Sequence, residues 1–224
     1  DFNGIMMNEC MLRRSMSEEA PVFETTTGPV RVITAASLFD GHDAAINVMR
    51  RLIQSSGAEV IHLGHDRSAK DVVDCAVQED AHAVALTSYQ GGHMEYFTYI
   101  RQLLDEAGCE HIRIFGGGGG TITPPEIRDL HKSGISKIYS PDDGREMGLT
   151  GMVGNAIEEA GKINLLEKSR FNSLSGAISA DDHGSVSKLL TMAENADDSD
   201  FQAILQRVRS VDTESGCPVV GLTG

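Results

Sequence analysis

The feature of this sequence that most constrains its fold is an alternation, from about residue 30, of short β-branched apolar runs with longer segments of helical periodicity. Such an alternation is typical of parallel strands that are covered by helices on both faces of the sheet. The sequence therefore predicts an α/β protein. The five predicted strands are Val30–Ala36, Glu59–Leu63, Ala83–Thr87, His111–Phe115 and Ile135–Tyr139.

Between these runs, residues 44–54, 69–78 and 96–107 place their apolar side chains at the spacings of one helix face. Gly57 and Gly108 follow two of these segments, where a helix end favours a left-handed residue. Pro124 and Pro125 predict the start of a fourth helix, because proline is tolerated in a first turn. Together these elements predict a flavodoxin-like (Rossmann-like), doubly wound, five-stranded parallel sheet.

The predicted sheet domain spans residues 30–150, and the chain on either side of it has a different character. Residues 1–29 form an irregular N-terminal segment. Residues 151–216 are rich in Asp, Glu, Ser and Asn, with helical patches at Gly184–Ala193 and Asp200–Val208. This composition indicates a mostly helical linker.

Charge and cysteine spacing limit the partners and the compartment. With 33 acidic against 19 basic residues, the formal charge is −14, so neither nucleic acid nor an anionic membrane is expected as a partner. No run approaches the roughly 18 apolar residues of a membrane span. The four cysteines are too widely spaced for a C-x-x-C site, which predicts reduced thiols and a cytoplasmic protein. They are Cys10, Cys75, Cys109 and Cys217.

In doubly wound sheets, ligands bind beyond the carboxyl ends of the strands, where the strand order reverses. The segments after the predicted strands are therefore the candidates for a site. They are residues 37–45, 64–68, 88–93, 116–125 and 140–144.

The first of these segments contains the tetrapeptide DGHD at residues 40–43. A metal-ligating histidine commonly donates a hydrogen bond from its second ring nitrogen to a carboxylate. This bond fixes the tautomer and raises the basicity of the nitrogen that binds the metal. Asp40, two residues before His42, is suited to that role. An aspartate that caps a helix beside an exposed histidine shows the same pattern, so the motif alone leaves both interpretations open.

Two weaker clusters follow the third and fourth strands. In the pentapeptide SYQGG at residues 88–92, the small residues would let a ligand enter beside the strand end, and the Ser88 hydroxyl could hydrogen-bond a ring nitrogen of that ligand. A tight turn that caps the next helix fits the pattern equally. The glycines at 116–120 permit close backbone approach but match no phosphate-loop motif. His62 and His65 lie three residues apart with the second in a predicted loop, which disfavours a two-histidine metal site.

In combination, these three loops resemble the cobalamin-binding domains of the methylmalonyl-CoA mutase superfamily, with their D-x-H-x-x-G, S-x-L and G-G motifs. The segments SLFDGHDAA, SYQGGHMEYF and IYSPDDGREMG look most like the fused isobutyryl-CoA mutases. In that family a cobalamin domain precedes a GTPase domain and a substrate barrel. The sequence departs from the motifs at Ala45, where glycine is usual, and at Gln90, where leucine is usual.

The resemblance implies that His42 is the lower axial ligand of cobalt, in place of the dimethylbenzimidazole of the cofactor, and that Asp40 holds its other nitrogen. The freed nucleotide tail would pass the loop at 88–92 and the first two glycines of 116–120. Tyr139, Ser140 and Asp143 would close its far end. The residues thus expected to contact the cofactor are Asp40, Gly41, His42, Asp43, Ser88, Gln90, Gly91, Gly92, Gly116, Gly117, Tyr139, Ser140 and Asp143.

The resemblance further implies an adenosylcobalamin-dependent mutase that interconverts isobutyryl-CoA and n-butyryl-CoA and is a homodimer at full length. Residues 217–224 resemble a strand entering the phosphate-binding loop of a GTPase domain, which would bind GTP and Mg²⁺ downstream of this chain. We expect these 224 residues to bind the cofactor without turning over substrate, because they contain no barrel.

Two other functions fit the same fold. A corrinoid carrier module of a methyltransferase usually has a helical bundle before its cobalamin domain, where this chain has only the irregular segment 1–29. A cobalt-free flavodoxin-like domain for signalling or flavin binding is the second alternative. A signalling receiver would place an Asp at the end of the third strand, where this chain has Thr87 and Ser88, and a Lys at the end of the fifth, where it has Tyr139 and Ser140.

Overall fold

The computed structural model describes residues 28–167, 169–170, 174 and 181–209. The chain forms two compact units, residues 1–164 and 165–224. The predictions for residues 1–27 and 217–224 lie outside the described residues.

The first unit contains one five-stranded sheet in which every strand pair is parallel. Its order, β2-β1-β3-β4-β5, is that of a doubly wound flavodoxin-like sheet, so the predicted fold class is confirmed. The order reverses between β1 and β3, which places the loops after these two strands side by side. The strands are β1 (Arg31–Ser37), β2 (Glu59–Arg67), β3 (Ala83–Thr87), β4 (Arg113–Gly117) and β5 (Lys137–Tyr139).

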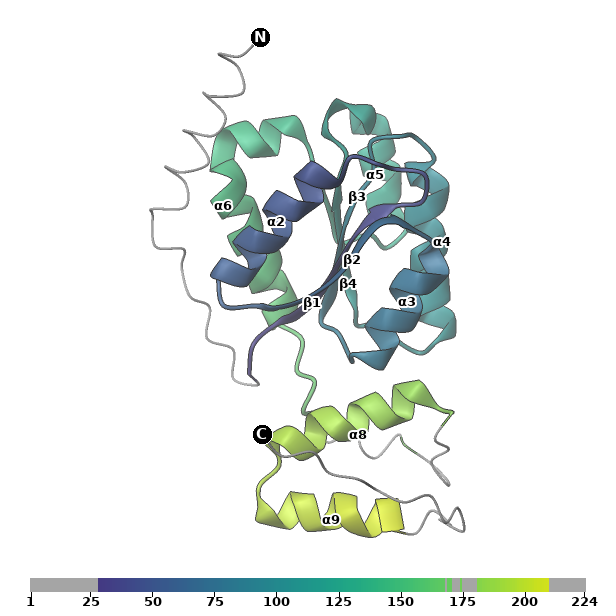
Figure 1. Ribbon diagram of the computed structural model, residues 1–224, viewed down its shortest axis with the longest axis vertical. Coiled ribbons are helices and arrows are strands. Elements are labelled where there is room, and N and C mark those ends of the chain that lie inside the picture. The colour runs from purple at the N-terminus through teal and green to yellow at the C-terminus, as the bar shows by residue number, and fades with distance from the viewer. Residues whose placement is uncertain (1–27, 168, 171–173, 175–180, 210–224) are drawn as a thin grey trace. The chain divides into compact units, whose positions relative to one another are not determined.

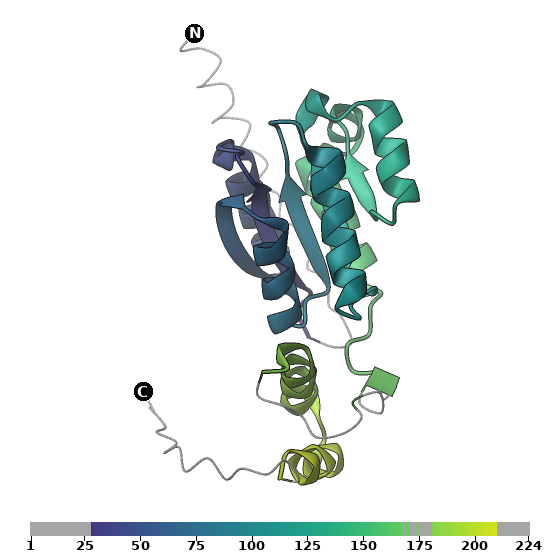
Figure 2. The same ribbon diagram turned by 90° about the vertical axis from the view of Figure 1, so that its right-hand side faces the viewer.

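Among the described residues of this unit, five helices cover the two faces of the sheet (Figure 1). They are α2 (Asp43–Ser55), α3 (Ala69–Gln78), α4 (His93–Glu106), α5 (Pro124–Lys132) and α6 (Pro141–Gly161). Side chains of α2 and α6 pack with Val32, Ala83 and Phe115 on one face. Side chains of α3, α4 and α5 pack on the other face, where α3 and α4 lie in front of the sheet in Figure 2. Alternate residues of each strand thus belong to different cores.

The ends of the helices follow local sequence signals. Gly57 and Gly108 have φ values of +88° and +64°, as predicted for glycines that follow a helix. Three helices begin with reciprocal capping boxes, which satisfy backbone N–H groups that have no partner within the helix. The pairs are Ser68 with Asp71, Thr123 with Glu126, and Ser140 with Asp143.

Two boundaries differ from the expectation. Strand β2 does not end at Leu63 but continues to Arg67, because a bulge at Gly64 (φ +85°) lets Arg67 pair with Ser37. His65, expected in a loop, therefore lies in a strand. Helix α6 continues past the expected domain end at residue 150 to Gly161, because Val153 and Ile157 are buried against the sheet.

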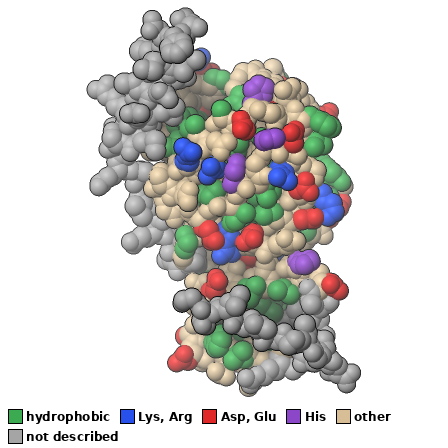
Figure 3. Space-filling model, in the orientation of Figure 1, with side chains coloured by type: hydrophobic (Ala, Val, Ile, Leu, Met, Phe, Trp, Pro, Cys, Tyr) green, Lys and Arg blue, Asp and Glu red, His purple; other side chains and the backbone are tan. Residues whose placement is uncertain are grey.

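The described part of the second unit contains α8 (His183–Asn195) and α9 (Asp198–Arg209), which contain the two helical patches read from the sequence. Leu174, Leu189 and Ile204 form a small core between them. Among the described residues, no helix is both long and apolar enough to cross a membrane. On the face shown in Figure 3, basic and acidic side chains are interspersed rather than gathered into a basic patch.

Candidate functional site

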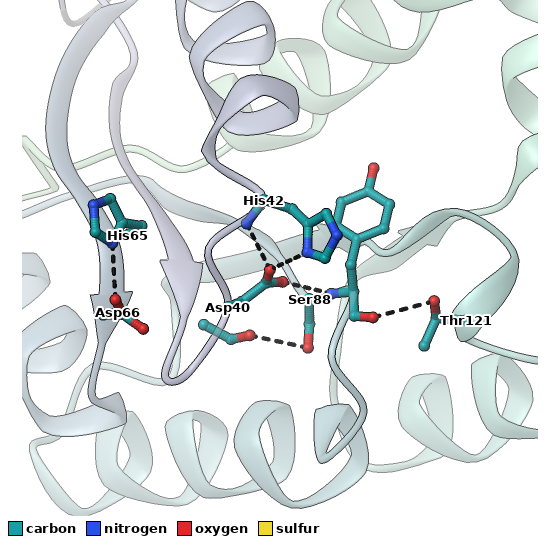
Figure 4. Close-up of polar contacts among 8 residues, drawn as sticks. Asp40, His42, His65, Asp66, Ser88 and Thr121 are labelled. Atoms are coloured by element: carbon teal, nitrogen blue, oxygen red, sulfur yellow. Dashed lines mark hydrogen bonds and ion pairs between the residues drawn. The ribbon is translucent and has the colours of Figure 1, made fainter.

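The Asp40 carboxylate and the His42 imidazole form the centre of the candidate site (Figure 4). His42 Nδ1 lies 2.8 Å from Asp40 Oδ1, and the backbone N–H of His42 donates to the same oxygen at 2.9 Å. A carboxylate only accepts hydrogen bonds, so Nδ1 carries the proton and the lone pair is on Nε2. The His42 side chain is 57% exposed, which leaves Nε2 accessible to a ligand.

Asp40 is held in place from both sides of the strand-order reversal. Its side chain is fully buried, and its Oδ2 accepts a hydrogen bond from the backbone N–H of Tyr89 at 2.6 Å. Burial raises the pKa of Asp40, but the hydrogen bonds from Tyr89 and His42 outweigh it, so the pKa lies below its ordinary value. The residue is therefore a fixed anion that ties the β1–α2 loop to the β3–α4 loop.

A second histidine in the domain shows what is particular about this pair. His65 is also 57% exposed, and its Nδ1 lies 2.9 Å from Asp66 Oδ2. Asp66, however, is 51% exposed and lies beside His65 in the edge strand β2. The two pairs share their chemistry, but only Asp40 is buried and anchored by a second loop.

The β3–α4 loop lies against the end of β1. Ser37 Oγ donates to Ser88 Oγ at 3.0 Å, and the backbone N–H of Ser88 donates to the Gly117 carbonyl at 2.9 Å. The ring of Tyr89 packs against the His42 imidazole with 5.4 Å between centroids. Tyr89 lies between two predicted site residues but was not itself predicted to contact the cofactor.

The five glycines at 116–120 fall into distinct structural roles. A Cβ at Gly116 would lie 2.4 Å from the Phe97 ring, and a Cβ at Gly118 would lie 2.0 Å from the Ser88 carbonyl oxygen. Gly119 has a left-handed φ of +56°, whereas a Cβ at Gly120 would meet nothing within 4 Å. Gly116 thus faces α4, while Gly117, the next strand residue, faces α2 and α6.

Thr87, the last residue of β3, is a candidate site residue that no sequence motif marks. It is 6% exposed, and its Oγ1 is buried with no hydrogen-bond partner. It shares a strand face with Ala83 and Ala85, and that face is turned toward α2 and α6. A buried hydroxyl without a partner costs roughly 1–3 kcal/mol, so this atom marks a position where a ligand can supply the missing bond.

The predicted residues at β5 form a network of their own. Tyr139 donates its hydroxyl hydrogen to Asn155 Oδ1 at 2.9 Å, and burial raises its pKa. Asp143 accepts from Ser140 Oγ at 2.6 Å and pairs with Lys137 Nζ at 3.0 Å. Burial acts to raise the pKa of Asp143, but these bonds lower it to about 2. Both carboxylate oxygens thus have partners within the fold.

The remaining predicted residues line the rim of the two loops. Gly41, Asp43, Gln90 and Gly92 are exposed. Gly91 and Gly92 have φ values of +85° and +66°, and α4 begins after them without a side-chain cap. Within the described residues, no three His, Cys, Asp or Glu side chains are arranged to hold a metal ion by themselves.

A family model described as the B12 binding domain matches residues 30–142, about half of the chain. The chain belongs to the B12-binding domain family. This domain is similar to the fused isobutyryl-CoA mutase of Geobacillus kaustophilus, with 46% identity over 87% of this chain and 18% of the relative. Identity to the fused isobutyryl-CoA mutase of Cupriavidus metallidurans is 47% over 87% of the chain and 17% of that protein.

A third relative, the fused isobutyryl-CoA mutase of Paraburkholderia xenovorans, is 58% identical over 57% of the chain and 10% of its own length. The matched part of the chain therefore spans less than a fifth of the length of each of these three fused relatives.

Proposed function

We propose that this domain binds adenosylcobalamin with His42 as the lower axial ligand, as the cofactor domain of a mutase that interconverts isobutyryl-CoA and n-butyryl-CoA. The observation that carries the proposal is the geometry of Asp40 and His42. A buried, anchored carboxylate holds Nδ1 and orients an exposed Nε2, which is what a metal-ligating histidine requires. The similarity to fused isobutyryl-CoA mutases supports the choice of substrate.

Bound adenosylcobalamin supplies a cobalt–carbon bond whose homolysis starts radical chemistry. The role of the chain is to bind and orient the cofactor. His42 would coordinate cobalt through Nε2, and Asp40 would keep the imidazole in the Nδ1–H tautomer. Since the Asp40 carboxylate also accepts from Tyr89 N–H, the position of the ligand depends on both loops.

The nucleotide tail of the cofactor would follow the sheet face that is turned toward α2 and α6. The unpartnered Thr87 hydroxyl lies on this face, and Gly117 of the adjacent strand leaves room beside it. Ser88 and Gln90 would border the entrance and Gly91 and Gly92 would leave it open, while Tyr139, Ser140 and Asp143 would bound the far end. Gly116 faces α4 instead, so we propose for it a packing role against Phe97.

The partners belong to the same proposal. Because the relatives are five to ten times longer than their matched part, the substrate barrel and a GTPase domain that binds GTP and Mg²⁺ would lie outside these residues. Homodimerisation of the full-length protein and a cytoplasmic location complete the proposal. The 224-residue chain by itself is expected to bind cofactor without mutase activity.

The test is to titrate the chain with adenosylcobalamin and record absorption spectra. We expect the spectrum of a form without coordinated dimethylbenzimidazole, and for cob(II)alamin we expect an electron paramagnetic resonance spectrum with coupling to one histidine nitrogen. His42→Ala should lose that coupling. His65→Ala is the matched control, because His65 has the same exposure and a similar Asp partner. If His42→Ala keeps the parent spectrum, His42 is not the ligand.

A further inference from the structure

The turn between β1 and the Asp40–His42 pair has an unusual residue at its tip. The backbone N–H of Asp40 donates to the Ser37 carbonyl at 3.0 Å, which closes a four-residue turn around Leu38 and Phe39. Phe39, the second central residue, has a φ of +63°. Turns with positive φ at this position favour glycine or asparagine, and a bulky aromatic residue there is strained.

The side chain of the same residue is also unfavourably exposed to solvent. Phe39 is 80% exposed and Leu38 is 42% exposed, so the turn presents two large apolar side chains to solvent. In the described residues, the other non-glycine positions with positive φ are Asp66 and Asp80. Aspartate adopts this conformation with little strain, whereas a bulky phenylalanine is strained in it. Strain and apolar exposure thus coincide at one residue.

Neither cost is offset by packing within the described part of the domain. The turn itself is useful, because it returns the chain so that Ser37 contacts Ser88 while Asp40 holds His42. Glycine or asparagine at position 39 would form that turn with less strain. The aromatic side chain therefore points to a contact that the chain makes with something else.

We propose that Phe39 is a cofactor contact whose ring packs against the corrin macrocycle that His42 holds. The inference rests on the proposed function. Phe39 lies three residues from His42, a chain span of at most roughly 11 Å. A corrin macrocycle held by the imidazole would offer apolar surface to Phe39, because its conjugated ring and its methyl groups are apolar between the amide side chains. Covering Phe39 with that surface would remove the exposed aromatic ring from water.

The test compares Phe39→Asn with the parent chain and with Phe39→Tyr. Asparagine suits positive φ but lacks the ring, so the unfolding temperature of the cofactor-free chain should stay equal or rise. Its dissociation constant for adenosylcobalamin should increase roughly tenfold or more, because the apolar contact is lost. Phe39→Tyr keeps the ring and should bind within about threefold of the parent.

The same titrations with adenosylcobinamide, which lacks the nucleotide tail, identify the part of the cofactor that Phe39 contacts. The loss of affinity in Phe39→Asn should persist, because the macrocycle is unchanged. The inference is overturned if Phe39→Asn binds adenosylcobalamin as tightly as the parent chain, or if its loss of affinity disappears with adenosylcobinamide. It is also overturned if the cofactor-free variant is less stable than the cofactor-free parent. A parent chain that shows no His42-dependent spectrum would instead refute the proposed function, and this inference with it.

Discussion

Gly118 and Ser88 approach each other so closely that a Cβ at position 118 would lie 2.0 Å from the Ser88 carbonyl oxygen. This contact joins the β4–α5 loop to the β3–α4 loop, which also holds Asp40 through the Tyr89 N–H. The two loops therefore form one rigid support for the candidate site. A change at Gly118 should therefore disturb the site through the backbone of Ser88.

The first prediction concerns this support. Gly118→Ala should lower the free energy of unfolding by roughly 1–3 kcal/mol, because backbone atoms of two loops have to separate. Urea denaturation measures the change. Gly120→Ala is the matched control, since a Cβ there meets nothing within 4 Å and φ is not positive, so its stability should be equal or slightly higher. Equal stability of both variants would show that the two loops are not in close contact.

The glycine run also shows how far sequence can predict this site. The five strands could be located because parallel strands covered on both faces leave continuous apolar runs. Five consecutive glycines, in contrast, are indistinguishable in sequence. Their roles depend on what other elements bring to them, namely the Phe97 ring at Gly116 and the Ser88 carbonyl at Gly118. Gly116 and Gly117 were both predicted to contact the cofactor, because the sequence does not show which other elements lie against each glycine.

The Asp40–His42 pair could be predicted because its chemistry is local. The two residues lie two positions apart at the end of a strand, and the hydrogen bond between them needs no other element. The anchoring of Asp40 by Tyr89 joins residues 49 positions apart and could not be read from spacing. Thr87 was overlooked for a similar reason, because threonine is an ordinary strand residue and only the fold leaves its hydroxyl without a partner.

The second prediction is that Asp40→Asn weakens both the fold and cofactor binding. The carboxylate accepts from the backbone N–H groups of His42 and Tyr89 and from His42 Nδ1. An amide group would turn an N–H donor toward at least one of these donors, so stability should fall by roughly 1–3 kcal/mol. Chemical denaturation and cobalamin titration measure the two effects.

Asp43→Asn is the control for this substitution, because Asp43 is an exposed carboxylate at the start of α2. Its effect on stability should stay within about 0.3–1 kcal/mol, the range of a helix-dipole interaction. If Asp40→Asn behaves like this control, the buried carboxylate does not hold the loops as the hydrogen bonds indicate.

The third prediction uses the low pKa of Asp143. Its pKa in the folded chain is about 2, below the ordinary value of 3.8, because Ser140 and Lys137 stabilise the charge against the effect of burial. A carboxylate whose pKa is lower in the folded chain than in the unfolded chain stabilises the fold at pH values above its unfolded-state pKa. This contribution is lost as the pH falls toward 2. Asp143→Asn should therefore cost about 2 kcal/mol at pH 7 and roughly half of that at pH 3.

Urea denaturation of both chains at the two pH values measures this difference. Asp142→Asn provides the comparison, because Asp142 lies in the same helical turn but is 79% exposed and pairs with the exposed Arg145. An exposed pair contributes little, so this variant should change stability by less than about 1 kcal/mol at either pH. A pH-independent cost for Asp143→Asn would mean that its hydrogen bonds, and not its charge, stabilise the start of α6.

The fourth prediction separates a binding role of Thr87 from a folding role. Thr87→Val removes a buried hydroxyl that has no partner, so the cofactor-free chain should be as stable as the parent or more stable, by up to roughly 1 kcal/mol. If the hydroxyl bonds the nucleotide tail, the dissociation constant for adenosylcobalamin should rise about tenfold. The two effects have opposite signs, which a defect in folding cannot produce.

Thr34→Val is the matched control on the adjacent strand β1, because Thr34 is also buried but its Oγ1 lies 2.9 Å from His62 Nδ1. Removing that hydroxyl breaks an existing bond and should cost about 1 kcal/mol. Should Thr87→Val destabilise the cofactor-free chain as much as Thr34→Val does, its hydroxyl has a partner within the fold. Should it leave the affinity for cobalamin unchanged, the tail does not reach the end of β3, and the route along the α2 and α6 face is wrong.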